Sequence, residues 1–94
     1  MRTTVRLASA LRTSAGGAAD VDLEVGADPT VRAVLDALAT AHPTIGWKLR
    51  DEAGDLRRHV NIFVGEENVR DLGGLDTPVP DGAVVTVLPA VSGG

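Results

Sequence analysis

The amino-acid sequence predicts an α+β domain, in which a mixed sheet of four to five strands carries one main helix across one face. Three observations support this fold class. Polar and apolar residues alternate at 3–8 and at 20–25, which is typical of half-buried strands. Apolar residues then recur every three or four positions between 31 and 41, as on one side of an amphipathic helix. Residues 83–88 are nearly all apolar, which favours a strand at the centre of a sheet.

The first two strands are expected to form a hairpin. The segment between them, 11–18, contains Ser14 and the pair Gly16-Gly17, and these residue types mark a turn. Two strands joined by such a short connection pair in antiparallel fashion.

The main helix is expected to begin at Pro29, in the first helical position behind an Asp28 cap, with Thr30 as an alternative cap. Pro43 disfavours helical geometry in the residue before it, so the helix should end near Ala41. The predicted buried stripe consists of Val31, Val34, Leu35, Leu38 and Ala41.

The second half of the chain supplies the rest of the sheet. A short second helix is expected within 44–50, and 60–64 predicts a strand. Residues 65–68 predict a turn, Val69 the start of a short edge strand, and 71–81 an irregular segment rich in glycine and proline. The first and last strands then lie side by side at the centre, beneath the helix. This arrangement is the β-grasp, or ubiquitin-like, fold.

Composition limits the classes of function. The 94 residues are sufficient for one domain, and their net charge of −4 disfavours nucleic acid as a partner. No stretch is apolar enough for a membrane helix, and the N-terminus lacks the apolar block of a signal peptide, so a cytoplasmic location is expected. The chain has no cysteine, which excludes disulfides and thiolate-held metal or iron–sulfur sites.

The sequence shows no arrangement that predicts catalysis. His42 and His59 lie far apart, so no metal site is expected from them. Neither a Ser-His-Asp set nor a pair of carboxylates stands out, and no Lys-Ser/Thr follows Gly16-Gly17 as in a phosphate-binding loop. We therefore expect neither an active site nor a bound cofactor.

The C-terminal end is the most distinctive part of the sequence. We expect a domain over 1–88 and a slender, flexible tail over 89–94 that ends in Gly93 and Gly94. Glycines place no side chain beside the terminal carboxylate, so it fits a narrow slot in another protein. The six-residue tail can reach roughly 20 Å, at about 3.3 Å per residue. These features predict a carrier whose reactive group is its own C-terminus.

A partner surface is expected where the tail leaves the domain. If Ile62 and Val87 face the helix, alternation turns Phe63 and Leu88 to the other face of the sheet, where they would form an exposed apolar patch. The predicted partner interface consists of Phe63, Leu88, Pro89 and Val91. The alternative is that Phe63, the single phenylalanine, belongs to the core.

The chain resembles the prokaryotic ubiquitin-like sulfur carriers, which include the small subunit of molybdopterin synthase and the thiamin sulfur carrier. Over 80–94, an Asp-Gly turn, an apolar strand, a proline and a Gly-Gly end appear at the spacing of that family. The strand 60–64, the stretch 73–75 and the turn after Leu11 look most like the branch that supplies sulfur for cysteine biosynthesis. The segment 44–59 is longer than in the smallest members, which argues against the thiamin carrier.

The resemblance implies the chemistry of the tail. An adenylating enzyme related to ubiquitin-activating enzymes would use ATP to join AMP to the Gly94 carboxylate, and Gly93 would give clearance. Sulfide or a persulfide would then replace AMP and leave a thiocarboxylate. A sulfur-accepting synthase would take the sulfur, so the chain would be a substrate of enzymes and not itself an enzyme.

Two other classes of function remain open from the sequence. The chain could be a protein modifier that is joined through Gly94 to lysines of target proteins, because both functions share the adenylate. It could also be a non-covalent interaction domain. Within the leading hypothesis, molybdopterin or another sulfur metabolite is the alternative product to cysteine.

Overall fold

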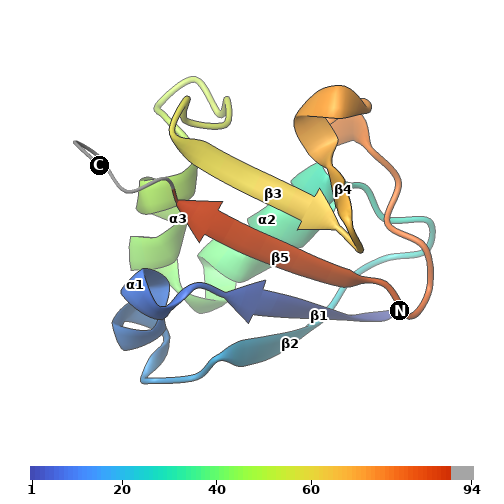
Figure 1. Ribbon diagram of the computed structural model, residues 1–94. Coiled ribbons are helices and arrows are strands. Elements are labelled where there is room, and N and C mark those ends of the chain that lie inside the picture. Colours follow the sequence, from blue (N-terminus) through green and yellow to red (C-terminus); the bar gives the residue numbers. More distant parts are fainter. Residues whose placement is uncertain (90–94) are drawn as a thin grey trace.

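The computed structural model describes residues 1–89, which build a five-stranded mixed sheet with helices across one face (Figure 1). The strands lie in the order β2-β1-β5-β3-β4. Their bounds are β1 Arg2–Leu7, β2 Asp20–Glu24, β3 Val60–Val64, β4 Glu67–Asn68 and β5 Val84–Pro89. The first and last strands are parallel neighbours at the centre, and the remaining pairs are antiparallel. This is the β-grasp arrangement predicted from the sequence.

The connection between β1 and β2 is more ordered than the predicted turn. A helical turn, α1 (Ser9–Arg12), and a 3₁₀ turn, η1 (Thr13–Ala15), precede the two glycines. Leu11 and Ala15 are buried, four residues apart on one side of these turns. The glycines still reverse the chain, since Gly16 has a φ of 69° and Gly17 a φ of 91°. Burial of the two apolar side chains therefore favours helical turns where the glycines alone indicated a simple loop.

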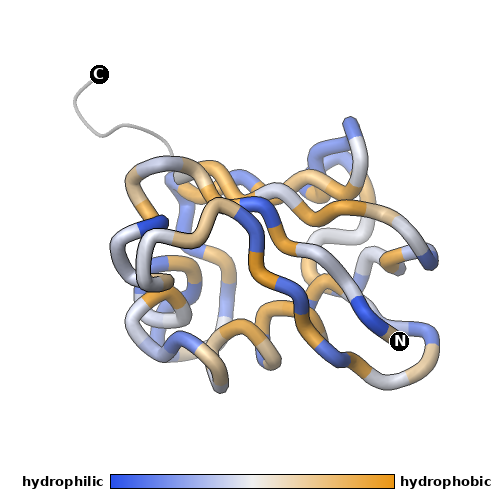
Figure 2. Tube along the Cα trace, turned by 90° about the horizontal axis from the view of Figure 1, so that it is seen from below, coloured by the Kyte–Doolittle hydropathy of each residue, from blue (hydrophilic) through white to orange (hydrophobic). Residues whose placement is uncertain are grey.

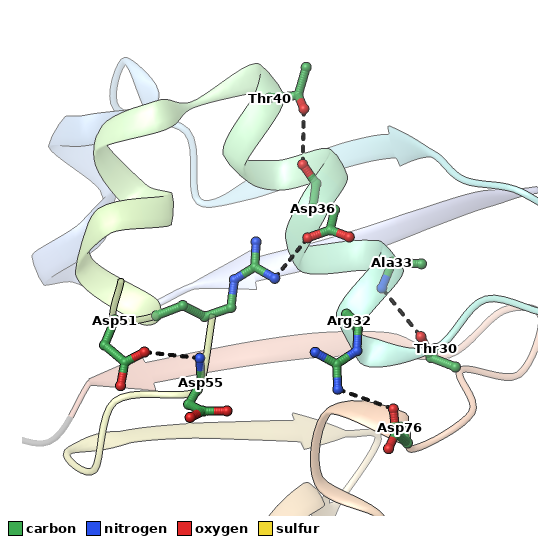
Figure 3. Close-up of polar contacts among 9 residues, drawn as sticks. Thr30, Arg32, Ala33, Asp36, Thr40, Asp51, Asp55 and Asp76 are labelled. Carbon is green, nitrogen blue, oxygen red and sulfur yellow. Dashed lines mark hydrogen bonds and ion pairs between the residues drawn. The ribbon is translucent and has the colours of Figure 1, made fainter. Parts of the chain in front are cut away.

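The main helix, α2 (Val31–Ala41), begins at the alternative cap. The Ala33 amide donates a hydrogen bond of 3.3 Å to Thr30 Oγ1 (Figure 3). The prediction that Asp28 caps a helix beginning at Pro29 is wrong. The backbone before the helix pairs with a distant segment instead, because the Pro29 carbonyl accepts from the Val79 amide at 2.9 Å.

The buried face of α2 follows the predicted stripe for about two turns. Val31, Val34, Leu35 and Leu38 are buried, whereas Ala41 is exposed because the chain turns there into α3 (Pro43–Leu49). Within α3, the predicted short helix, Ile45 and Leu49 are buried and Trp47 is exposed. A Cβ at Gly46 would lie 2.6 Å from the Ala39 Cβ, so glycine permits the close approach of α2 and α3.

The edge beside β3 differs from the prediction. The short edge strand β4 comes before Val69, which instead begins a 3₁₀ turn, η2 (Val69–Asp71), followed by η3 (Gly74–Asp76). The Asn68 side chain accepts from the Arg70 amide at 3.0 Å and so caps η2. Val69 is completely buried, and the turn at this point carries its side chain into the core.

The core lies between the sheet and the helices. Hydrophilic and hydrophobic residues alternate along the strands of the first hairpin, as expected for a sheet with one covered face (Figure 2). Val5, Leu7, Val85 and Val87 project from the two central strands and are fully buried. The burial of these apolar side chains between the sheet and α2 fixes the orientation of β5.

Candidate functional site

The strand β5 is the central strand of the sheet, and the C-terminal tail follows it in the sequence. Pro89 is the last residue of the strand and lies opposite Val60 on β3. Proline has no amide hydrogen for a further ladder bond, so the strand pairing stops here. The predictions for Val91, Gly93 and Gly94 fall outside the described residues, which end at Pro89. The base of the tail is thus at the end of the sheet where β3 begins and β5 ends.

The predicted alternation along β3 and β5 is present. Ile62 and Val87 are fully buried, whereas Leu88 is 41% exposed. Phe63 is half-buried, lies opposite Thr86 and does not belong to the core cluster. Phe63 and Leu88 are therefore diagonal neighbours on the face of the sheet away from the helices. The two side chains form what we call the sheet patch.

An open hollow borders Phe63 at the end of β3 farther from the tail. Its volume is about 440 Å³, and Leu72, 46% exposed, forms part of its wall. Carboxylates of Glu66, Glu67 and Asp71 surround it. Sequence reasoning placed Leu72 in an irregular segment and missed its exposure, because nothing local distinguishes an exposed leucine in a loop.

A ladder of paired polar side chains covers the other half of this face. Arg2 contacts Glu24 at 3.2 Å, and Arg6 contacts Asp20 at 3.1 Å. Between them, Thr4 Oγ1 donates to the Asp22 carboxylate at 2.8 Å. The hydrogen bond to Asp20 raises the pKa of Arg6 above its ordinary value. The charges of β1 and β2 thus satisfy one another, and the sheet patch beside them remains apolar.

Across residues 1–89, no group of three or more histidine, aspartate or glutamate side chains is placed to hold a metal ion. In the same residues, no helix is long and apolar enough to cross a membrane.

Comparison with known proteins agrees with this geometry. A model of the ThiS family matches residues 5–94. The sulfur carrier protein CysO of Mycobacterium tuberculosis is 41% identical over 96 residues, which covers 100% of both chains. In the crystal structure of the Amycolatopsis orientalis BexX/CysO complex, a matching chain has a TM-score of 0.84 and 39% identity, over 98% of this chain and 99% of that one.

A modifier protein has a similar fold. The crystal structure of SAMP1 from Haloferax volcanii matches with a TM-score of 0.86 and 30% identity, over 100% of both chains. The family match spans nearly the whole chain, and the CysO relative covers all of it. The chain therefore belongs to the ThiS family, and it is a ubiquitin-like sulfur carrier rather than an enzyme.

Proposed function

We propose that this protein carries sulfur as a thiocarboxylate on Gly94 and donates it in biosynthesis, with cysteine as the first-choice product. The observation that carries the proposal is the pair Gly93-Gly94, which follows Pro89, the last residue of the central strand β5, by four and five positions. Identity of 41% to CysO over the full length supports the assignment to this type of carrier.

Activation makes a poor electrophile reactive. A carboxylate oxygen of Gly94 attacks the α-phosphorus of ATP, pyrophosphate leaves, and an acyl-adenylate forms. Hydrosulfide then attacks the acyl carbon, AMP leaves, and a proton is released from the sulfur. If the donor is a persulfide, the product is an acyl disulfide, which a thiol must cleave to free the thiocarboxylate. The ionised sulfur is a strong nucleophile, like a thiolate of low pKa.

Two partner enzymes follow from this chemistry. An E1-like adenylyltransferase supplies the ATP site, so the chain itself needs no bound cofactor, and a sulfur-accepting synthase resembling a cysteine synthase takes the product. Dependence on ATP favours the expected cytoplasmic location. The sheet patch of Phe63 and Leu88, with Pro89 and Val91, is proposed to meet a partner. The existence of a BexX/CysO complex supports docking of such a carrier on another protein.

The test is formation of the thiocarboxylate in a defined mixture. The full chain is incubated with the adenylyltransferase of the same organism, ATP and a sulfide source, and its intact mass is measured. We expect the mass to rise by the difference between one sulfur and one oxygen atom. A chain without Gly93 and Gly94 serves as the control and should stay unchanged. Failure of the intact chain to gain sulfur would overturn the proposal.

Within the first function, molybdopterin and other sulfur metabolites are the alternative products. The second candidate function is that of a protein modifier. Similarity to SAMP1, a small archaeal modifier protein, favours it. As a modifier, the Gly94 acyl group would be transferred to a lysine amine with loss of AMP. Denaturing gels of cell extract distinguish the two functions. Ladders that disappear when Gly94 is deleted would support conjugation.

A further inference from the structure

We propose that a groove beside Trp47, on the helical side of the molecule, is a second docking surface for the adenylating enzyme, and that an arginine or lysine of that enzyme lies against the indole. We call this surface the Trp47 groove. The inference rests on the proposed function and adds to it a recognition site and the charge of the partner segment.

Trp47 is exposed to an extent that is unusual for an indole. Its exposed fraction is 65%, the highest of the large hydrophobic side chains among the described residues. It borders an open groove of about 560 Å³ between α3, α2 and the loop 51–54. Tryptophan is enriched among the residues that dominate binding energy at protein interfaces. An exposed indole beside a concave surface therefore indicates a contact site more strongly than an isolated apolar residue does.

The walls of the groove are held in place by the fold. Arg50 Nη1 contacts Asp36 Oδ1 at 2.7 Å and joins the end of α3 to α2. The Asp51 Oδ1 atom accepts from the amides of Ala53 and Asp55, at 2.9 and 3.0 Å, and shapes the loop. A preformed surface loses little conformational entropy when a partner binds.

The charges around the groove indicate its occupant. The carboxylates of Asp36, Asp51 and Glu52 line it together with one cation, Arg50, which is already paired with Asp36. Within residues 1–89, Asp51 and Glu52 form no ion pair. A guanidinium or ammonium group placed over the indole would gain a cation–π interaction and face these two carboxylates. A basic segment of a protein fits this surface.

A short series of contacts links the backbone of Trp47 to the base of the tail. Arg57 Nε donates to the Trp47 carbonyl at 2.9 Å. The Arg57 carbonyl accepts from the Val60 amide at 3.0 Å, and Val60 is the residue paired with Pro89. Through these contacts Trp47 is connected to the strand end from which the tail begins, so a protein that takes up the tail is proposed to reach the Trp47 groove as well.

The chemistry of the tail selects the adenylating enzyme as the occupant. A sulfur-accepting synthase meets a thiocarboxylate, a group that distinguishes the loaded carrier from other proteins. The adenylating enzyme meets an ordinary C-terminal carboxylate, which most proteins share. It must therefore identify its substrate from the folded surface next to the tail, and the groove supplies an aromatic and acidic feature there.

The first measurement observes the groove directly. Because the chain contains one tryptophan, 5-fluorotryptophan labelling gives a single ¹⁹F signal that tryptophans of an unlabelled enzyme cannot obscure. We expect this signal to shift or broaden when the E1-like adenylyltransferase of the same organism is added to the full chain. An unmoved signal, under conditions in which the enzyme adenylates the chain, would overturn the proposal.

The second measurement compares variants in pyrophosphate exchange. Trp47→Ala and Glu52→Lys should each raise the KM for the chain about tenfold, with little change in kcat. Asp81→Lys is the matched control for Glu52→Lys, because Asp81 is exposed and lies before β5, at the opposite end of that strand from Pro89, and its KM should not change. Thermal unfolding checks that every variant is folded.

The outcomes separate this proposal from the proposed function. If the wild-type chain is adenylated and Trp47→Ala has an unchanged KM, the groove proposal fails while the function stands. If the wild-type chain is not adenylated at all, the function fails and the groove proposal fails with it.

Discussion

Val60 and Pro89 face each other as the last pair between β3 and β5. Pro89 ends the central strand, whereas Val60 begins the strand that carries Phe63. The Val60 amide donates a hydrogen bond to the Arg57 carbonyl, and the Arg57 side chain donates one to the Trp47 carbonyl. The base of the tail is therefore connected to a surface on each side of the sheet.

Phe63→Asp should weaken recognition by the adenylating enzyme. A carboxylate in the sheet patch would lose apolar contact area and would be desolvated in the complex, so we expect the KM for the chain to rise about tenfold. Pyrophosphate exchange measures the effect, and Phe63→Leu, which keeps an apolar side chain, is the control. Normal adenylation by a folded Phe63→Asp chain would show that this patch takes no part in recognition.

Gly46→Ala should destabilise the domain even though alanine has the higher helix propensity. The added Cβ would stand 2.6 Å from the Ala39 Cβ, so α2 and α3 would have to separate. We expect the free energy of unfolding to fall by about 1–2 kcal/mol, as for other overpacked sites. Urea denaturation measures the change.

Two variants serve as controls for Gly46→Ala. One makes the same substitution at an open position, and the other removes the atom that the new Cβ would contact. At Gly26 a Cβ meets nothing within 4 Å, so Gly26→Ala should change the free energy of unfolding by less than about 0.5 kcal/mol. Adding Ala39→Gly to Gly46→Ala removes the close contact and should recover part of the loss. A stabilised Gly46→Ala single variant would contradict the packing described here.

Thr30→Ala should lower the free energy of unfolding by about 1 kcal/mol, because the Ala33 amide loses its side-chain acceptor. Chemical denaturation compares it with Asp28→Asn. Asp28 has a φ of 50°, and asparagine tolerates this conformation, so that variant should be nearly neutral. A Thr30→Ala variant as stable as the wild type would contradict the capping contact between Thr30 and Ala33.

Leu38→Ala should be the most destabilising of these changes. Leu38 is fully buried on α2, and removal of its branched end leaves a cavity in the core. We expect a loss of about 2–5 kcal/mol in the free energy of unfolding. Thermal or urea unfolding tests the value, and Arg32→Ala on the exposed side of the same helix is the control. Equal effects of the two substitutions would contradict the assignment of the buried stripe.

The sequence determined the elements whose signal is local and repeated. Alternation along β3 predicted its bounds, 60–64, and the apolar character of β5 predicted its central place next to β1. The stripe on α2 predicted five buried residues, of which four are buried and Ala41 is exposed, since one helical period decides which side faces the sheet. The C-terminal Gly-Gly rests on the sequence alone, because the described structure ends at Pro89.

Only the tertiary structure decided the features that depend on contacts between distant segments. Thr30 rather than Asp28 caps α2 because the preceding backbone is paired with the chain near Val79. Val69 enters a 3₁₀ turn because the core accepts its side chain there. The Trp47 groove exists because α2, α3 and the loop 51–54 meet around an indole that the core leaves exposed. Local propensity contains no information about these contacts between distant segments, because their geometry depends on how the whole chain packs.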